Sequence, residues 1–149
     1  MLFRSISAGT LAVTVNNALG TSAAGTTIAS GATLDLQNVT YSTTEALTVS
    51  GGTIKTSTGT SSFAGAISLT ANSTIDVSGT QLTLSGIISS TSTYSITKSS
   101  SGTLILSGAN TYTGATTISA GTLALAESGT LGNIVSALTI TSEIGRAHV

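Results

Sequence analysis

The sequence predicts an all-β fold, a parallel β-solenoid with about 20 residues per coil and about six to seven coils. Two observations carry this prediction. Aliphatic residues come in short i, i+2 pairs rather than at helical spacing, and these pairs recur along the chain with a nearly constant step. Chain length fits one domain, by the usual size of about 100–200 residues per domain.

The aliphatic pairs mark the expected strands. Examples are "LDL" at 34–36, "IDV" at 75–77 and "LIL" at 104–106. Alternation places both aliphatic side chains of a pair on one face of a short strand. Gly, Ser, Asn and Thr, the residues that favour turns, lie beside most of these pairs. The pattern therefore predicts short strands joined by tight corners.

The pairs fall into two interleaved series with steps of 17 to 22 residues. The first series contains Leu34, Ile54, Ile75, Ile96, Ile118 and Leu138. The second series contains Ile28, Leu47, Ile67, Ile87, Leu104 and Leu123. Stacked coils at the strand spacing of about 4.8 Å would turn each series into an internal ladder, in a rod on the order of 30 Å long.

Two other all-β folds fit less well. An antiparallel sandwich has turns every 8–12 residues or so, but it does not require similar residues to recur at every second strand. A transmembrane barrel needs strands of about 9–11 residues with aromatic girdles, whereas aromatic residues make up 3% of this chain. The parallel β-solenoid is therefore favoured.

The composition excludes several partners and sites. Charged residues are 6% of the chain and the net charge is −1, so the basic footprint of a nucleic-acid-binding protein is missing. With no cysteine, disulfides and thiolate metal sites are impossible. No apolar run reaches the ~18 residues of a membrane helix. The start of the chain imitates a signal peptide, but Ser, Gly and Thr interrupt its apolar part.

Both ends of the chain look foreign to the solenoid. The codons for Leu2–Ser5 and for Ile144–Arg146 can be written as parts of one sequencing adapter and of its reverse complement. We therefore expect residues 1–5 and 143–149 to be derived from an adapter, and residues 6–142 to be a β-solenoid fragment of a longer one. The only histidine, His148, falls in the second of these segments.

A search for chemistry finds no catalytic, cofactor-binding or metal-binding residues, and no small-molecule substrate is expected. The best acidic pair is Asp35 and Asp76, which lie two coils apart, at about 9.6 Å by strand spacing. This spacing is near that of an inverting glycosidase, about 6.5–9.5 Å. Lys55 falls between them in the same series, however. Two solvated surface carboxylates in an acid–base–acid ladder are the favoured interpretation, and an enzyme is not expected.

One stretch carries a recognisable motif. Residues 101–125 read SGTLILSGANTYTGATTISAGTLAL, which resembles the autotransporter-associated β-strand repeat. The matching positions include Gly102, Leu104, Asn110 and Tyr112, while Ala115 stands where the family often has glycine. The "ISAGTLA" of residues 118–124 also occurs at 6–12, as if it ended an earlier copy.

The resemblance implies a passenger of a type V secreted protein. Such passengers are right-handed parallel β-helices at the surface of a Gram-negative bacterium, or secreted from it. The chain would then continue into further coils and a C-terminal translocator barrel. The resemblance implies a structural stalk that supports adhesion, with contacts to host surfaces or other cells. The alternative is an inert shaft of an enzyme-type passenger whose catalytic part lies elsewhere.

Two further expectations concern individual residues. Asn110 is expected to hydrogen-bond a corner, and Tyr112 and Phe63 to cover a coil edge or a turn, rather than to bind sugar.

A third function, binding to ice or a crystal surface, would need a regular threonine array. The residues in the middle of the aliphatic pairs, such as Asp35, Lys55 and Ile105, are too irregular for one.

Overall fold

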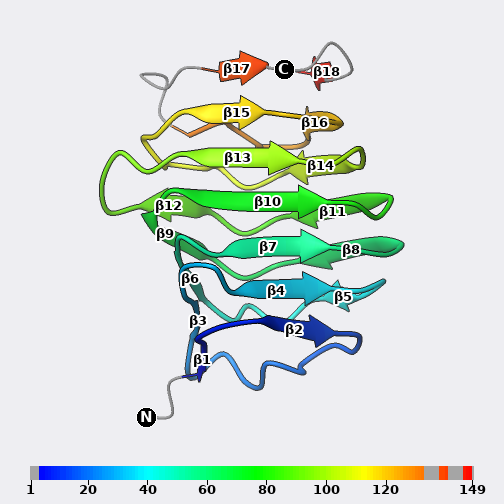
Figure 1. Cartoon of the computed structure of the whole chain (residues 1–149), viewed down its shortest axis with the longest axis vertical. Helices are drawn as coiled ribbons and strands as arrows, with labels where there is room; N and C mark the ends of the chain where they lie inside the picture. Colours follow the sequence, from blue (N-terminus) through cyan, green and yellow to red (C-terminus); the bar gives the residue numbers. More distant parts are fainter. Residues whose placement is uncertain (1–3, 133–137, 141–145, 149) are drawn as a thin grey trace.

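The protein is a stack of coils whose strands lie one above another (Figure 1). The structure is a computed structural model that describes residues 4–132, 138–140 and 146–148. Of the two terminal segments expected to be foreign, only residues 4–5 and 146–148 lie within this part, and their origin stays a prediction. Among the described residues there is no helix, and so none that could cross a membrane.

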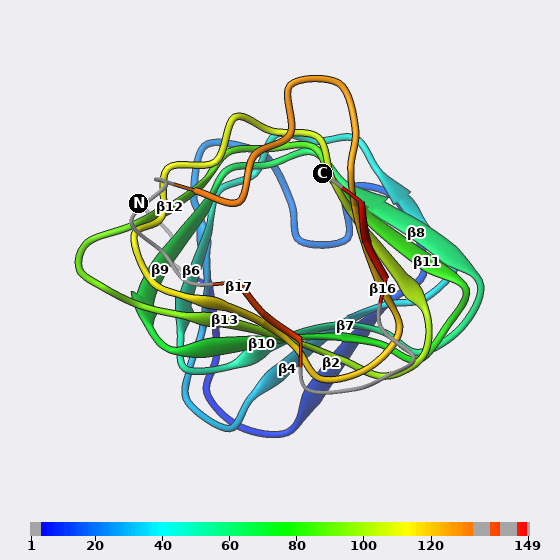
Figure 2. The same ribbon diagram turned by 90° about the horizontal axis from the view of Figure 1, so that it is seen from above.

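Three parallel sheets form the sides of the rod, as the view from above shows (Figure 2). Sheet A contains β1 (Arg4–Ile6), β3 (Thr26–Ile28), β6 (Leu47–Ser50), β9 (Ile67–Ala71) and β12 (Ile88–Ser90). Sheet B contains β2 (Thr10–Val13), β4 (Thr33–Leu36), β7 (Thr53–Thr56), β10 (Ser73–Val77), β13 (Ile96–Ser99), β15 (Thr116–Ile118) and β17 (Leu138–Ile140). Sheet C contains β5 (Thr40–Tyr41), β8 (Thr60–Phe63), β11 (Gln81–Leu84), β14 (Thr103–Leu106), β16 (Thr122–Leu125) and β18 (Arg146–His148).

Each coil visits the sheets in the order A, B, C, so we number the coils 1 to 7 from the N-terminus. Coil 1 has β1 and β2, coils 2 to 5 have three strands each, coil 6 has β15 and β16, and coil 7 has β17 and β18. Neighbouring strands of a sheet are parallel and in register, with equivalent positions 20 to 23 residues apart in sheet B. The predicted parallel β-solenoid is confirmed.

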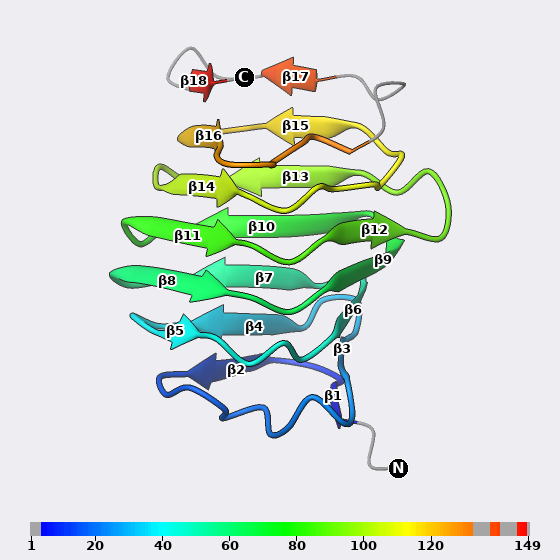
Figure 3. The ribbon, with the colours of Figure 1, turned by 180° about the vertical axis from the view of Figure 1, so that it is seen from behind.

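The corners between sheets differ in regularity. From coil 2 to coil 6, three residues join the B strand to the C strand, and four of these corners contain a residue with positive φ: Asn38, Gly59, Ser100 and Gly121. The A-to-B corner is variable: it has one residue between β9 and β10 but five between β12 and β13. Seen from behind, the loop after β12 extends beyond the other corners (Figure 3).

The longer corner makes part of the predicted register wrong. Leu34, Ile54 and Ile75 occupy one row of sheet B, as expected. On the next strand, however, Lys98 pairs with Ile75, and Ile96 pairs with Ser73. A slip of two residues leaves every side chain on the same face, so the alternation of aliphatic residues does not reveal it.

The second predicted series was also wrong in part, because it joined two different sheets. Leu47 and Ile67 pair in sheet A, whereas Leu104 and Leu123 pair in sheet C. Within sheet A the row of Ile67 continues at Ile88, while Ile87 is 49% exposed. Ile28 belongs to the neighbouring row, opposite Val49. Aliphatic pairs look alike in all three sheets, so their spacing alone cannot assign them to a side.

The core is a column of aliphatic rows with aromatic rings between them. Tyr41 and Phe63 stack in sheet C with ring centroids 5.4 Å apart, and both are completely buried. Tyr112 is completely buried as well. The expectation that Phe63 and Tyr112 cover an edge or a turn is therefore wrong, because a ring this large stabilises the fold most when it fills the interior of a coil.

Sheet A ends before the other two sheets do. Its last strand is β12 in coil 5, and residues 107–115 cross the same side of coil 6 without forming a strand. This segment still binds the edge of β12, since the amide nitrogen of Thr111 donates to the carbonyl oxygen of Ile88 at 2.8 Å. Coil 6 is thus joined to coil 5 by two sheets and a loop.

Candidate functional site

The predicted charge ladder lies on the outer face of sheet B. Asp35 on β4, Lys55 on β7 and Asp76 on β10 are neighbours in one row, which confirms the predicted register of these coils. Lys55 Nζ and Asp76 Oδ2 form an ion pair at 3.0 Å. Burial alone would raise the pKa of Asp76, but hydrogen bonds from Ser100 and Lys55 and the charge of Lys55 hold it below its usual value.

Asp35 has a different environment from Asp76. It is 4% exposed, and its carboxylate accepts hydrogen bonds from the amide and hydroxyl of Ser57 and from Gln37 Nε2 at 2.7 to 2.9 Å. These partners place the Asp35 carboxylate at the B-to-C corner of the next coil. The carboxylate supports that corner. Because Lys55 lies between Asp35 and Asp76, the two carboxylates do not face a shared opening as an acid and base pair would.

The two residues of the motif that could suggest sugar binding face inward instead. Asn110 is 5% exposed; its Oδ1 accepts from the amide of Ile88, and its Nδ2 donates to the carbonyl oxygen of Thr130. Asn110 therefore joins coil 5 to the chain beyond coil 6, as a corner residue should. The Tyr112 hydroxyl lies 2.6 Å from Thr116 Oγ1, and burial raises the pKa of Tyr112.

A row of threonines, which was not predicted from the sequence, runs along sheet B. Each strand of this 7-stranded sheet contributes one member, and none is buried. The members are Thr10, Thr33, Thr53, Thr74, Thr97, Thr117 and Thr139. The adjacent row carries Ala12, Asp35, Lys55, Asp76 and Ser99. The hydroxyls thus form a single line beside charged residues, not the flat array that a crystal surface would need.

A buried carboxylate lies near the N-terminal end of the rod. Glu45 is completely buried between coils 2 and 3. Its Oε1 accepts from Thr26 Oγ1 and from Arg4 Nη2 at 3.0 Å, and its Oε2 accepts from the Tyr41 hydroxyl at 3.2 Å. Burial raises the pKa of Tyr41, and the negative charge of Glu45 raises it further, while a hydrogen bond from Leu19 opposes both.

A buried lysine occupies an aliphatic row in coil 5. Lys98 stands in the row of Ile75 and Ile118 and is 0% exposed. Its ammonium donates to the carbonyl oxygens of Ser99, Ser100 and Ala120 at 2.7 to 3.1 Å. Burial lowers the pKa of Lys98 to about 8, although the charge of Asp76 acts in the opposite direction.

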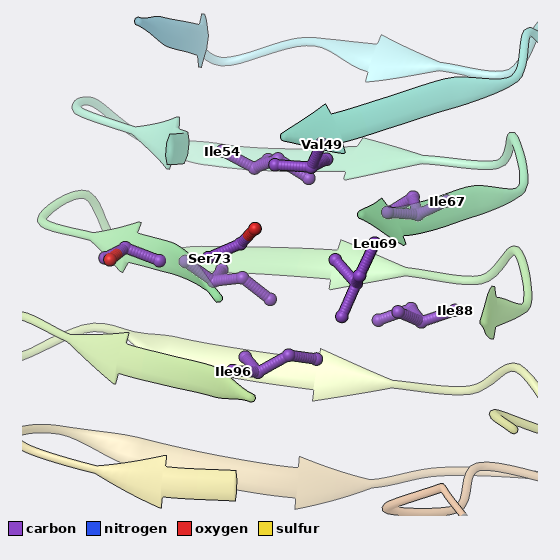
Figure 4. A pocket seen from close by; sticks show the side chains of 9 residues that line it. Val49, Ile54, Ile67, Leu69, Ser73, Ile88 and Ile96 are labelled. Atoms are coloured by element: carbon purple, nitrogen blue, oxygen red, sulfur yellow. The ribbon is translucent and has the colours of Figure 1, made fainter. Parts of the chain in front are cut away.

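One enclosed void in the core is too small for a ligand. A void of about 10 Å³ lies between coils 3, 4 and 5, bounded by Val49, Leu69, Ile88, Ile96 and other core side chains (Figure 4). This volume is close to the minimum for one water molecule. In the part of the chain that the structure describes, no group of three or more His, Cys, Asp or Glu residues could hold a metal ion.

The comparisons with known proteins agree with this architecture. Residues 96–125 match the family model of the passenger-associated-transport-repeat. The match is consistent with an autotransporter passenger repeat in this part of the chain. Its matched part runs from β13 through β16 and includes Lys98, Asn110 and Tyr112. Neither the curated proteins nor the solved structures contain a match to the chain.

The repeat and the solenoid together fit the stalk of an autotransporter passenger. In the motif, Gly102 and Gly121 belong to three-residue corners, Leu104 and Leu123 fill one row of sheet C, and Asn110 binds the neighbouring coils. Leu104, Leu123 and Asn110 therefore contact neighbouring coils directly. These roles suggest a structural function for the repeat.

Proposed function

We propose that this chain is a stalk segment of a surface-exposed autotransporter passenger of a Gram-negative bacterium, and that it supports adhesion by holding a binding region away from the cell. The observation that carries the proposal is the match of residues 96–125 to the passenger-associated-transport-repeat, because these residues form part of a continuous solenoid. Further coils and a translocator would complete the parent protein.

The arrangement of side chains supports a stalk better than a catalyst. A solenoid coil contacts only its neighbours, so each coil can stack on the one before it without long-range contacts. One outer row of sheet B carries a threonine in every coil, and buried hydrophobic side chains from successive coils form one core cluster. The alternative is an inert shaft of an enzyme-type passenger, with the catalytic part outside residues 1–149.

Surface display tests the proposal. The chain would be placed between an N-terminal epitope-tagged binding domain and an autotransporter translocator, and produced in a Gram-negative host. We expect the tag to reach the cell surface, the rod to resist proteinase K, and the cells to adhere to a surface coated with the target of the binding domain. An intracellular tag, or a rod digested at once, would contradict the passenger assignment.

Deletion of one coil separates a stalk from a part with its own activity. Leu47 and Ile67 occupy the same position in successive coils, so removal of residues 47–66 joins equivalent points of the rod and shortens it by about 4.8 Å. We expect the shortened rod to be displayed and to support adhesion nearly as well. A matched deletion of ten residues, which breaks the register, should abolish display. Sequencing of the complete reading frame then decides between an adhesin and an enzyme-type passenger.

A further inference from the structure

We propose that coil 6 is a detachable coil of the rod, and that its attachment to coil 5 weakens when Lys98 carries its proton. Three features meet at this step between coils: sheet A stops, a lysine replaces an aliphatic residue in the core, and the ammonium of that lysine bridges the two coils. The proposal goes beyond the stalk function and does not depend on it.

The first feature reduces the number of sheets that cross the step. Coils 4 and 5 are joined in all three sheets, through β9–β12, β10–β13 and β11–β14. Coils 5 and 6 are joined by strand pairing in two sheets, through β13–β15 and β14–β16, and by the loop of residues 107–115 on the third side. In place of a strand, Asn110 Oδ1 accepts from the amide of Ile88 in β12, and Thr113 Oγ1 donates to the carbonyl oxygen of Ser92 in the corner that follows. A region with fewer ladder hydrogen bonds opens at a lower free-energy cost.

The second feature places a titratable group in the core at the same step. Lys98 is followed in its row by Ile118 of coil 6, and both are completely buried. The carbonyl oxygen of Lys98 accepts from the amide of Ser119, and its ammonium donates to the carbonyl oxygen of Ala120. Separation of coil 6 from coil 5 therefore breaks both contacts and exposes the ammonium to water.

The burial of Lys98 determines whether a lower pH favours or opposes the opening of coil 6. A charged ammonium loses more hydration energy on burial than a neutral amine does. Among the strands of coils 4 to 6, the only other charged side chain is Asp76 on β10, and its attraction does not cancel the cost of burial. The attached state thus binds the proton less tightly than the open state, where Lys98 has an ordinary pKa. Opening takes up a proton, so it becomes easier as the pH falls.

Hydrogen–deuterium exchange measures this opening directly in the intact chain. With a pKa of about 8 when attached and 10.5 when open, the equilibrium constant for opening should fall on the order of 30-fold from pH 7 to pH 9.5. After correction for the intrinsic exchange rate, we expect the protection of amides in β15 and β16 to rise by this factor, and the protection of amides in β4 and β7 to stay nearly constant.

Three variants complete the test. Lys98→Met should remove the pH dependence, and Lys98→Arg, which stays charged, should keep β15 and β16 weakly protected at both pH values. Lys55→Met removes a partly exposed lysine that pairs with Asp76 on the same sheet, and it should change the pH dependence much less than Lys98→Met does. A change of equal size in all coils, or a pH dependence that survives in Lys98→Met, would overturn the proposal. If Lys98→Met does not fold, the comparison between coils in the wild type still decides.

Discussion

Glu45 and Lys98 are both completely buried in the same rod, but the two regions accommodate their charges differently. The carboxylate of Glu45 receives three side-chain donors, one of them the guanidinium of Arg4. The ammonium of Lys98 is bound by main-chain carbonyl oxygens alone. Glu45 depends on particular side chains of coils 1 and 2, whereas Lys98 depends on the geometry of a corner. A solenoid can therefore stabilise a buried charge either with specific side chains or with main-chain carbonyl oxygens.

Removal of the buried carboxylate should have the largest effect. In Glu45→Ala, the hydroxyls of Thr26 and Tyr41 and the guanidinium of Arg4 lose their acceptor. We expect the free energy of unfolding to fall by about 3–4 kcal/mol, because each buried hydroxyl that loses its acceptor costs about 1–3 kcal/mol, whereas the Arg4 side chain is 31% exposed and still reaches water. Urea unfolding followed by circular dichroism at pH 7 measures this loss.

The control for this prediction is Glu45→Gln, which keeps the size of the side chain and one carbonyl acceptor. Its expected cost is smaller, about 1–3 kcal/mol. A loss below about 1 kcal/mol in Glu45→Ala would mean that the polar cluster contributes no more than an exposed pair. The contrast with Lys98 would then disappear.

The pH dependence of stability should be the next largest effect, and it belongs to Lys98. The folded pKa of about 8 lies below the ordinary value of 10.5, so the unfolded chain binds the proton more tightly. The resulting stabilisation is complete above the unfolded pKa and is lost as the pH falls through the folded pKa. Between pH 9.5 and pH 7 we expect a loss of about 2 kcal/mol in the free energy of unfolding.

Denaturant titrations at several pH values measure this slope. Lys98→Met should make it nearly flat, while Lys55→Met should change it much less, because Lys55 is partly exposed and acts on Lys98 only through Asp76. A wild-type slope of the opposite sign would show that the three carbonyl oxygens and Asp76 stabilise the ammonium more than burial destabilises it.

The contrast also shows how far the sequence could predict this fold. The rows through Leu34, Ile54 and Ile75 were predictable because the paired residues of coils 2, 3 and 4 are 20 and 21 residues apart, which is the step of the aliphatic pairs. Lys98 was not, because the five-residue corner before β13 shifts the register by two residues without changing which side chains face inward. Length variation in one corner is thus invisible to a periodic pattern.

The two buried charges left different signals in the sequence. Tyr41 and Glu45 are four residues apart, as are Tyr112 and Thr116, and each tyrosine hydroxyl binds the later residue. This spacing was a usable signal for a polar contact at a corner. Nothing comparable marks Lys98, whose partners are main-chain carbonyls that every residue possesses. Its burial follows only from the three-dimensional register.

The smallest expected effect concerns the charge ladder on the outer face of sheet B, which shows what a charge does when its pair is partly solvated. Lys55 lies between Asp35 and Asp76 in one row of sheet B, and its ion pair with Asp76 is partly solvated. Lys55→Ala removes one attractive pair, with an expected loss of about 0.5 kcal/mol. Lys55→Glu also places three like charges on successive rungs, so its loss should be larger, about 1 kcal/mol.

Because salt screens exposed charges, the difference between the two variants should shrink in about 1 M sodium chloride. The pH slope assigned to Lys98 should persist there, since buried groups are screened less. Equal losses for Lys55→Ala and Lys55→Glu at low salt would contradict the observed register of these three residues, whereas a difference that salt removes would separate the surface ladder from the two charges in the core.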